Sequence, residues 1–373
     1  MRILIVGALL IAYGLLAVYS VSIHESFTLT LKIFEDPTNY FYFFRHLRNI
    51  AIAIIMALIA YRIPIKFFKK HKNIVIISIL IFLLQLLVFV PGIGISLNGA
   101  RGWIDIPGIP SIQPSEFFKL GYVIFMAAWL IRKKKSIDND NQFIISFVVI
   151  NALFLFIFLL IPDLGSVLVM GAVGLTMALY AGMDWKKIVG LLFAGVAGVV
   201  VVGSIAGMMN DRFAYIQKRM TYFISSNTDE ESRGIGRQNE QALTAIGGGG
   251  FMGKGYGKGL QKFGYIPEAQ SDFIFAAFSE EMGFFGNIIL LGLYFYLVYY
   301  VLIKLVHVRD EYNKMLAIGI LSLIIIQAFI NMGVNLKILP NTGLTLPFIS
   351  HGGSALMVNM IELILLYKII ENK

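Results

Sequence analysis

Cysteine is absent from this sequence of 373 residues. Its absence excludes disulfide bonds and metal sites built from thiolates, and it leaves the redox state of the compartment open. Charged residues are also scarce, at 14%, whereas hydrophobic residues make up 58% and the mean hydropathy is +0.78. This balance excludes a water-soluble globular protein, because apolar runs long enough to cross a bilayer recur along the chain.

Several motifs of soluble proteins are missing as well. The sequence has neither zinc-finger spacing nor a Walker loop, and the G-x-G-x-G at Gly253–Gly257 follows no expected strand, which excludes a dinucleotide-binding fold. Nucleic acid is not needed to explain the net charge of +9, because most of the excess lies in short runs such as KFFKKHK and RKKK, which would attract anionic lipid headgroups. No internal repeat is evident, which disfavours a transporter built from inverted repeats.

Hydropathy predicts an all-α polytopic integral membrane protein with about ten transmembrane helices, forming a single domain over residues 1–373. The first apolar run is long for a signal peptide and further spans follow it, so we interpret it as the first transmembrane helix. The expected spans are residues 3–23, 47–61, 73–90, 115–131, 142–161, 165–182, 188–208, 283–303, 315–335 and 352–367. The interval 209–282, between the seventh and eighth spans, is then a large loop within the domain.

The distribution of basic residues predicts the orientation. More than half of the 31 basic residues fall in the termini and short loops on one side of the expected spans. The positive-inside rule assigns that side to the cytoplasm, together with both chain termini. If the large loop is left aside, the basic residues on the opposite side are only Lys32, Arg45, Arg48, Arg101, Lys119 and Lys337. The large loop is therefore expected to be extracytoplasmic in a bacterial cytoplasmic (inner) membrane protein.

The large loop carries cations among glycines. Between Gly247 and Gly264 the glycines alternate with Lys254, Lys258 and Lys262. A pliable backbone of this kind could bring its ammonium groups together around an anion, for which phosphate is the natural candidate.

Two acids follow these lysines. Glu268 and Asp272 lie directly before the apolar run 273–278, which is typical of the entrance of a membrane helix. A carboxylate at this position would lie where water meets lipid and could act on a substrate there. The alternative is a flexible surface loop with a solvated acid. Glu280 and Glu281, which follow this run, serve as controls for a mere loss of negative charge.

Other polar residues lie at positions where lipid would make them costly. Glu116 and Lys119 are three residues apart in the expected fourth span, so they share a helical face and can pair, either around a cavity or as an ion pair that locks helices together. In the preceding outer loop, Arg101 could bind an anion, whereas Trp103 alone is more typical of an interfacial anchor. Asp163 in PDLGS predicts a helix cap.

A polar stripe crosses the expected ninth span. Gln327, Asn331 and Asn335 recur at intervals of four, which predicts hydrogen bonding between helices. His351 follows in an outer loop, where a lone histidine is more often structural than catalytic.

Several of these segments together resemble the FtsW/RodA (SEDS) family. They are NGARGW with QPSEFFK, PDLGS, QALTAIGGGGFMGKGYGKG with YIPEAQSDFIFAAFSEEMGFFG, and TGLTLPFISHGGS, in the family's order and across nearly the whole chain. QSDFIFA and GLTLPFIS resemble the division branch, FtsW, more than the elongation branch, RodA. The chain departs from the family pattern at Gly102, where a second basic residue is common, and at His351, where tyrosine is common.

The resemblance implies a peptidoglycan glycosyltransferase that polymerises lipid II at the outer face of the cytoplasmic membrane, in septal cell-wall synthesis during division. It implies that Asp272 is the essential acid and that Glu116 and Lys119 are a functionally important pair. The partners it implies are lipid II, the nascent glycan strand, a class B penicillin-binding protein transpeptidase and divisome membrane proteins. The alternatives are a lipid II flippase, a RodA-type polymerase of elongation, or a scaffold that only recruits partners. A scaffold role would assign no function to Asp272.

The chemistry fits a polymerase independently. A polyprenyl diphosphate leaves easily once its charge is neutralised, so one base at the acceptor hydroxyl is enough. Neutralisation would come from basic side chains, and a divalent cation would also fit the diphosphate. The polar chemistry of the chain gathers on the outer side, which favours an outer-face enzyme over a transporter. We expect substrate contacts from Arg101, Trp103, Glu116, Lys119, Lys254, Lys258 and Glu268, with no metal site built from protein ligands.

Overall fold

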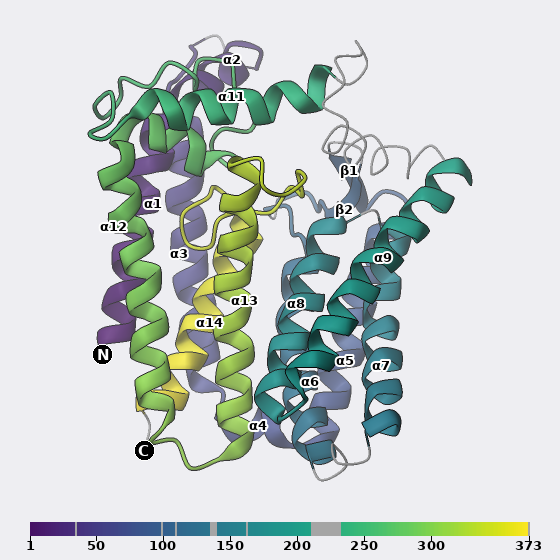
Figure 1. Cartoon of the computed structure of the whole chain (residues 1–373). Coiled ribbons are helices and arrows are strands. Elements are labelled where there is room, and N and C mark those ends of the chain that lie inside the picture. The colour runs from purple at the N-terminus through teal and green to yellow at the C-terminus, as the bar shows by residue number, and fades with distance from the viewer. Residues whose placement is uncertain are drawn as a thin grey trace. The chain divides into compact units, whose positions relative to one another are not determined.

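The computed structural model describes residues 1–33, 36–97, 100–108, 110–134, 140–161, 163–209 and 233–371, and most of these are helical (Figure 1). The α-helices are α1 (Arg2–Val21), α2 (Ile23–Leu31), α3 (Phe41–Arg62), α4 (Ile65–Lys69), α5 (His71–Leu86), α6 (Pro114–Lys133), α7 (Asp140–Leu160), α8 (Leu164–Ala181), α9 (Trp185–Met209), α11 (Arg233–Gly249), α12 (Ile274–Leu305), α13 (Glu311–Asn335) and α14 (Gly353–Glu371). A short 3₁₀ helix, η1 (Leu87–Phe89), extends α5. The strands β1 (Gly94–Leu97) and β2 (Ala100–Ile104) follow it.

The predicted membrane spans are present as helices. Within the described residues, nine helical segments are long and apolar enough to cross a membrane, namely α1, α3, α5 with η1, α6, most of α7, α8, α12, α13 and α14. The 25-residue α9 covers the remaining expected span, 188–208. Helices suit this environment because they satisfy every backbone polar group internally where lipid offers no partner. The predicted polytopic all-α fold is confirmed.

The chain divides into two compact units, each assembled from segments that are distant in sequence. Unit 1 contains Met1–Leu58, Lys218–Val301 and Gln327–Leu363, and unit 2 contains Ile59–Gln217, Leu302–Ile326 and Ile364–Lys373. Most of the predicted loop 209–282 belongs to unit 1, and its residues 210–232 lie outside the described part of the chain.

Unit 2 is built around α6. This helix packs against α5 and α8, and α8 packs in turn against α7 and α9 (Figure 1). Between η1 and α6 the antiparallel hairpin β1–β2 places Ile95 opposite Trp103. Its base rests on a buried cluster of Val88, Ile104 and Ile161. The hairpin was not expected from the sequence, because a short run between Gly, Pro and Asn residues reads as an outer loop.

Unit 1 depends on close helix contacts at small residues. A Cβ at Gly7 of α1 would lie 2.2 Å from Leu363 Cδ2 of α14, and a Cβ at Gly14 would lie 2.7 Å from the Phe348 carbonyl oxygen. Also in α1, Tyr13 packs its ring edge to face against Phe278 of α12, with the two ring centroids 5.2 Å apart. Glycine in α1 therefore lets a neighbouring side chain and a neighbouring backbone approach closely, as is usual where helices associate in lipid.

α12 is interrupted at Gly283, which has φ 64° and ψ −165°. The expected eighth span began at residue 283, but the helix begins at Ile274 and residue 283 is where it breaks. A glycine is required there because this backbone conformation, close to the extended region at positive φ, is accessible to few other residues.

The glycine-rich loop fills this break. The N–H groups of Lys254 and Gly255 donate to the carbonyls of Glu280 and Glu281 at 2.9 and 3.0 Å, and the N–H groups of Phe284 and Phe285 donate to the carbonyls of residues 250 and 251 at 3.0 and 3.1 Å. The loop thus satisfies backbone groups on both sides of the break that would otherwise have no partner.

α11 adds a helix inside the predicted loop. Asn239, Ala242 and Ala245 are buried on one face of α11, and a Cβ at Gly249 would lie 2.3 Å from the Ser279 carbonyl oxygen. Figure 1 shows α11 running across the end of α12 rather than along it. The 233–282 part of the loop is therefore largely ordered structure packed on α12.

Candidate active site

Asp272 lies two residues before α12 and is half-buried. Its carbonyl oxygen accepts hydrogen bonds from the side-chain amides of Asn331 and Asn335, both at 2.9 Å. These residues belong to the predicted polar stripe of α13, and the prediction that the stripe hydrogen-bonds other segments is confirmed. Gln327, the third member, donates to the Thr345 carbonyl at 3.2 Å.

The two residues before Asp272 are held in the same way. The Gln270 carbonyl accepts the N–H of His351 at 2.9 Å, and the Ser271 carbonyl accepts the hydroxyl of Ser350 at 2.6 Å. The carbonyls of three successive residues are therefore bonded to α13 or to the segment between α13 and α14. Because each of these three residues is held through its carbonyl, the position of the Asp272 Cα, from which the side chain extends, is fixed.

The carboxylate of Asp272 lies next to a turn. Gly343, with φ +70°, is placed so that a Cβ there would lie 3.6 Å from Asp272 Oδ2. The Gly343 N–H donates to Asn341 Oδ1 at 3.1 Å, which tightens the turn. The Gly343 turn thus borders the carboxylate on one side. Because Asp272 is partly exposed, a ligand can still reach it.

Glu268 supports the same segment. Its φ of 53° is unusual for a residue other than glycine, and its carboxylate Oε2 accepts the Ser271 hydroxyl at 3.1 Å. Its N–H donates to Glu25 Oε1 of α2 at 3.2 Å. Burial, and secondarily the negative charge of Glu268, raises the pKa of the Glu25 carboxyl above its usual range. Sequence reasoning missed Glu25, whose only signal was an acid in an outer loop otherwise poor in charge.

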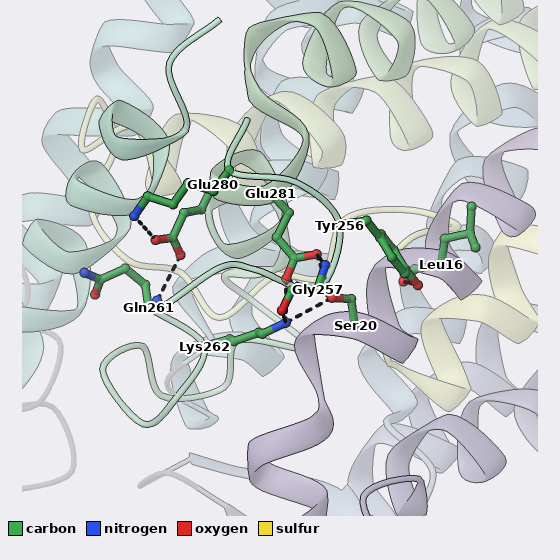
Figure 2. A network of polar contacts seen from close by, with 9 residues as sticks. Leu16, Ser20, Tyr256, Gly257, Gln261, Lys262, Glu280 and Glu281 are labelled. Carbon is green, nitrogen blue, oxygen red and sulfur yellow. Dashed lines mark hydrogen bonds and ion pairs between the residues drawn. The ribbon is translucent and has the colours of Figure 1, made fainter. Parts of the chain in front are cut away.

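Two of the three loop lysines, Lys254 and Lys262, form ion pairs with buried glutamates, and Figure 2 shows Lys262 with its partners. Lys254 Nζ lies 2.6 Å from Glu280 Oε1, and Lys262 Nζ lies 2.7 Å from Glu281 Oε1. Both glutamates are 0% exposed. Their expected use as controls for a mere loss of charge is therefore wrong: they are structural anchors of the glycine-rich loop.

Glu281 is the centre of this network. It accepts hydrogen bonds from the Ser20 hydroxyl of α1 at 2.6 and 2.8 Å and from the N–H of Gly257 at 2.9 Å (Figure 2). The other oxygen of Glu280 accepts the N–H of Gln261 at 2.9 Å. Each carboxylate is thus satisfied by a cation and by a backbone donor, which is what a buried charge requires.

Lys258 differs from its neighbours. Its side chain is exposed, and within the described residues its ammonium forms no ion pair with a carboxylate. Of the cations in the described glycine-rich segment, Lys258 is therefore the one available to an external anion without breaking an internal bond.

In unit 2, Lys119 Nζ lies 2.8 Å from Glu116 Oε1, and the side chains are 1% and 5% exposed. The predicted pairing is confirmed. Trp103 is half-buried in the β1–β2 hairpin, and Arg101 contributes its backbone to β2 while its side chain lies outside the described atoms. Asp163 caps α8 by accepting the Ser166 N–H at 2.9 Å, as predicted.

His351 is unsuited to act as a base. Burial, together with the nearby His46, Arg45 and Arg48, lowers the pKa of His351 to about 3. Its ring packs edge to face against Tyr42 at 5.2 Å. Both observations agree with the predicted structural role. Among the described residues there is no cluster of three or more His, Cys, Asp or Glu side chains that could hold a metal ion.

Comparison with known proteins identifies relatives over the full length. A model of the FtsW/RodA/SpoVE family, described as cell cycle protein, matches residues 1–373. A probable peptidoglycan glycosyltransferase FtsW of Nitrosomonas europaea is 34% identical, over 97% of this chain and 90% of that protein. Stage V sporulation protein E of Bacillus subtilis is 35% identical, over 94% of this chain and 91% of that protein.

Solved structures share the fold. A chain of a peptidoglycan synthase complex that coordinates polymerization and crosslinking superposes with a TM-score of 0.74 at 24% identity, covering 98% of this chain and 96% of that one. The rod shape determining protein RodA of Thermus thermophilus superposes with a TM-score of 0.65 at 22% identity, covering 98% and 95%. At these identities the likeness establishes the polytopic helical architecture alone.

Proposed function

The chain belongs to the FtsW/RodA/SpoVE family and is a multi-pass membrane peptidoglycan glycosyltransferase, and we propose that it polymerises lipid II with Asp272 as the general base. The observation that carries this proposal is the fixation of residues 270–272, whose carbonyls are bonded to α13 and to the segment after it, while Asp272 stays partly exposed. An acid held in this way can meet a substrate hydroxyl without first being ordered.

In the proposed reaction, the 4-hydroxyl oxygen of the acceptor sugar attacks the anomeric carbon of the donor. The Asp272 carboxylate accepts the proton of that hydroxyl during the attack. The bond from that carbon to the polyprenyl diphosphate breaks, and the diphosphate leaves with the bonding electrons. General-base catalysis of this kind contributes about 10²–10⁴-fold. The remaining acceleration then has to come from charge stabilisation and positioning.

Stabilisation of the leaving diphosphate is assigned first to Lys258, because its ammonium is exposed and forms no ion pair with the described carboxylates. Lys254 would have to give up Glu280 to take part. Arg101 is a further candidate, since guanidinium groups bind phosphate well. Lys119, which is 1% exposed and paired with Glu116, would have to be uncovered and give up that pair to take part. We propose Trp103 and Glu268 as additional substrate contacts, and Glu116 as one that requires its buried pair with Lys119 to open.

We propose that the site faces outward from the cytoplasmic membrane, with both termini in the cytoplasm. The support is the asymmetric distribution of lysine and arginine among the short loops. In this orientation the lipid tails of both substrates lie among the spans, so their headgroups are confined to the membrane surface. The bilayer then supplies part of the positioning that the reaction needs.

We propose a class B penicillin-binding protein as the partner that cross-links the product, and septal cell-wall synthesis with divisome proteins as the setting. The support is indirect: the fold is shared with a chain from a peptidoglycan synthase complex, and relatives in division and sporulation cover most of this chain.

The deciding experiment mixes the purified protein in detergent with lipid II, in the absence of any other polymerase, and separates the products by gel electrophoresis. Glycan strands are expected from the wild type. Their absence under conditions in which a control polymerase is active would contradict the proposal and leave a translocation or scaffold role.

A further inference from the structure

The side chain of Asn335 hydrogen-bonds to backbone groups before and after the first residue of α12. It is fully buried, its Oδ1 accepts the N–H of Ala276 at 3.0 Å, and its Nδ2 donates to the Asp272 carbonyl at 2.9 Å. The Ala276 N–H belongs to the first turn of α12, where backbone donors have no partner within the helix. One side-chain amide from α13 therefore caps α12 and fixes Asp272 relative to it.

Asn331, one helical turn earlier, adds a second restraint. Its Nδ2 donates to the Asp272 carbonyl at 2.9 Å and to the Leu344 carbonyl at 2.7 Å. Leu344 directly follows Gly343, the residue next to the Asp272 carboxylate. Asn331 thus connects the segment that carries the acid with the turn that borders it.

The two asparagines also stabilise each other, since Asn335 Nδ2 donates to the Asn331 carbonyl at 2.9 Å. Both side chains are almost entirely removed from solvent, at 0% and 1% exposure, so neither can contact substrate directly. The Nδ2 groups of both asparagines and the Oδ1 of Asn335 bond to backbone groups of residues 272, 276, 331 and 344. The Oδ1 of Asn331 is buried and has no hydrogen-bond partner among the described residues. Burying two amides in a membrane helix is costly, and the bonds that are made offset part of that cost.

We propose that Asn331 and Asn335 are positioning residues of the transferase, which act on the reaction by holding the Asp272 backbone and thereby the reach of its carboxylate. This inference rests on the proposed role of Asp272 as the base. A displacement of about 1 Å at a reacting group can cost about 10²-fold in rate. Loss of this restraint should therefore lower turnover while leaving the affinity for lipid II, which depends on other contacts, largely intact.

The test measures kcat and KM for lipid II polymerisation by detergent-purified variants, well below their melting temperatures. Asn335→Ser shortens the side chain so that it no longer reaches the Asp272 carbonyl. We expect kcat to fall about 10- to 100-fold with KM within about threefold of wild type. Asn331→Ser removes the other bond to the Asp272 carbonyl but leaves the cap of α12 by Asn335, so its kcat should fall in the same manner by a smaller factor. It decides the question if Asn335→Ser cannot be purified.

Gln327→Met is the matched control. Gln327 is a buried amide on the same stripe of α13, and its Nε2 donates to the carbonyl of Thr345, which lies outside the 270–272 segment. Its kcat should stay within about threefold of wild type even if its melting temperature falls. The positioning role is overturned if the serine variants keep their kcat, if they raise KM instead, or if Gln327→Met loses as much kcat as they do.

Asp272→Asn in the same assay separates the two proposals. If Asp272→Asn turns over at the wild-type rate, the base is misassigned, whatever the asparagine variants do. If Asp272→Asn collapses while both serine variants keep their kcat, only the positioning role is lost.

Discussion

The ammonium of Lys262 and the carboxylate of Glu281 lie 2.7 Å apart with exposures of 1% and 0%, and together they anchor the glycine-rich loop beside the break in α12. A charge pair this deeply buried stabilises the fold only while both partners are present. The loop that appears pliable in sequence is therefore held by interactions that a single substitution can abolish.

The first prediction concerns this pair. Lys262→Met leaves the Glu281 carboxylate buried without its cation, which should cost about 3–5 kcal/mol of stability. Thermal unfolding in detergent checks it. Lys69→Met is the control, because Lys69 pairs with Asp310 at the surface, where side-chain exposures are 52% and 37% and a pair contributes about 0–1 kcal/mol. Equal melting shifts for the two variants would contradict the structural assignment of Lys262.

The second prediction concerns Glu116 and Lys119. Replacing either one, as in Glu116→Gln or Lys119→Met, removes a charge from a pair that is almost fully buried, so polymerisation or folding should fail. The exchange Glu116→Lys with Lys119→Glu restores opposite charges and should recover part of the loss. Both readouts, melting temperature and glycan synthesis, are needed. Wild-type behaviour of both single variants would show the pair to be incidental.

Glu25 gives a pH-dependent prediction. Burial and Glu268 raise the pKa of Glu25 in the folded protein, so the native state binds the proton more tightly than the unfolded state. Stability from this group is therefore present below the unfolded pKa, about 4.3, and is lost as the pH rises through the higher folded value. Glu25→Gln, which keeps the acceptor for the Glu268 N–H, should melt at a higher temperature than wild type at pH 7.5, with the gap closing towards pH 4. A gap that is unchanged over this range would contradict it.

The sequence was sufficient for features that depend on local pattern. Long apolar runs predicted the spans, because a bilayer demands internally bonded helices. Asp163 before a helix predicted a cap, and the spacing of Asn331 and Asn335 predicted a bonded stripe. Glu116 and Lys119 were predictable as a pair because three residues on a helix bring side chains together.

Features that depend on distant segments were not predictable in the same way. Glu25 and Glu268 are 243 residues apart, and Ser20 and Glu281 are 261 apart. Nothing local distinguishes Glu281, which is buried in an ion pair, from a solvated acid. The partners of the loop lysines were hidden for the same reason. Only the structure separates Lys258, which forms no ion pair with a described carboxylate, from Lys254 and Lys262, which do.

The absence of cysteine makes the topology testable. Tyr265→Cys places a thiol at a position that is 53% exposed in the loop before α12, and His307→Cys places one on the exposed segment between α12 and α13. A membrane-impermeant maleimide should label Tyr265→Cys in intact spheroplasts and His307→Cys only after permeabilisation. Labelling of both without permeabilisation would refute the proposed orientation.

The last prediction is that Asp272→Asn abolishes polymerisation without disturbing the fold. The amide keeps the size of the side chain, and the bonds from Asn331 and Asn335 go to the backbone carbonyl, so the substitution leaves them intact. Melting temperature should therefore stay near wild type. The proton acceptor is lost, so the rate of glycan synthesis should fall by about 10²–10⁴-fold or more.

Its controls follow from the geometry. Glu268→Gln keeps an oxygen that can accept the Ser271 hydroxyl and should have a milder effect, and Asp36→Asn removes an exposed carboxylate and should have none. Glu280 and Glu281 cannot serve, because their loss would unpair Lys254 and Lys262 and confuse folding with catalysis. If Asp272→Asn polymerises near the wild-type rate while Glu268→Gln is inactive, Glu268 is the base; if all three variants are active, the reaction does not use a carboxylate of this segment.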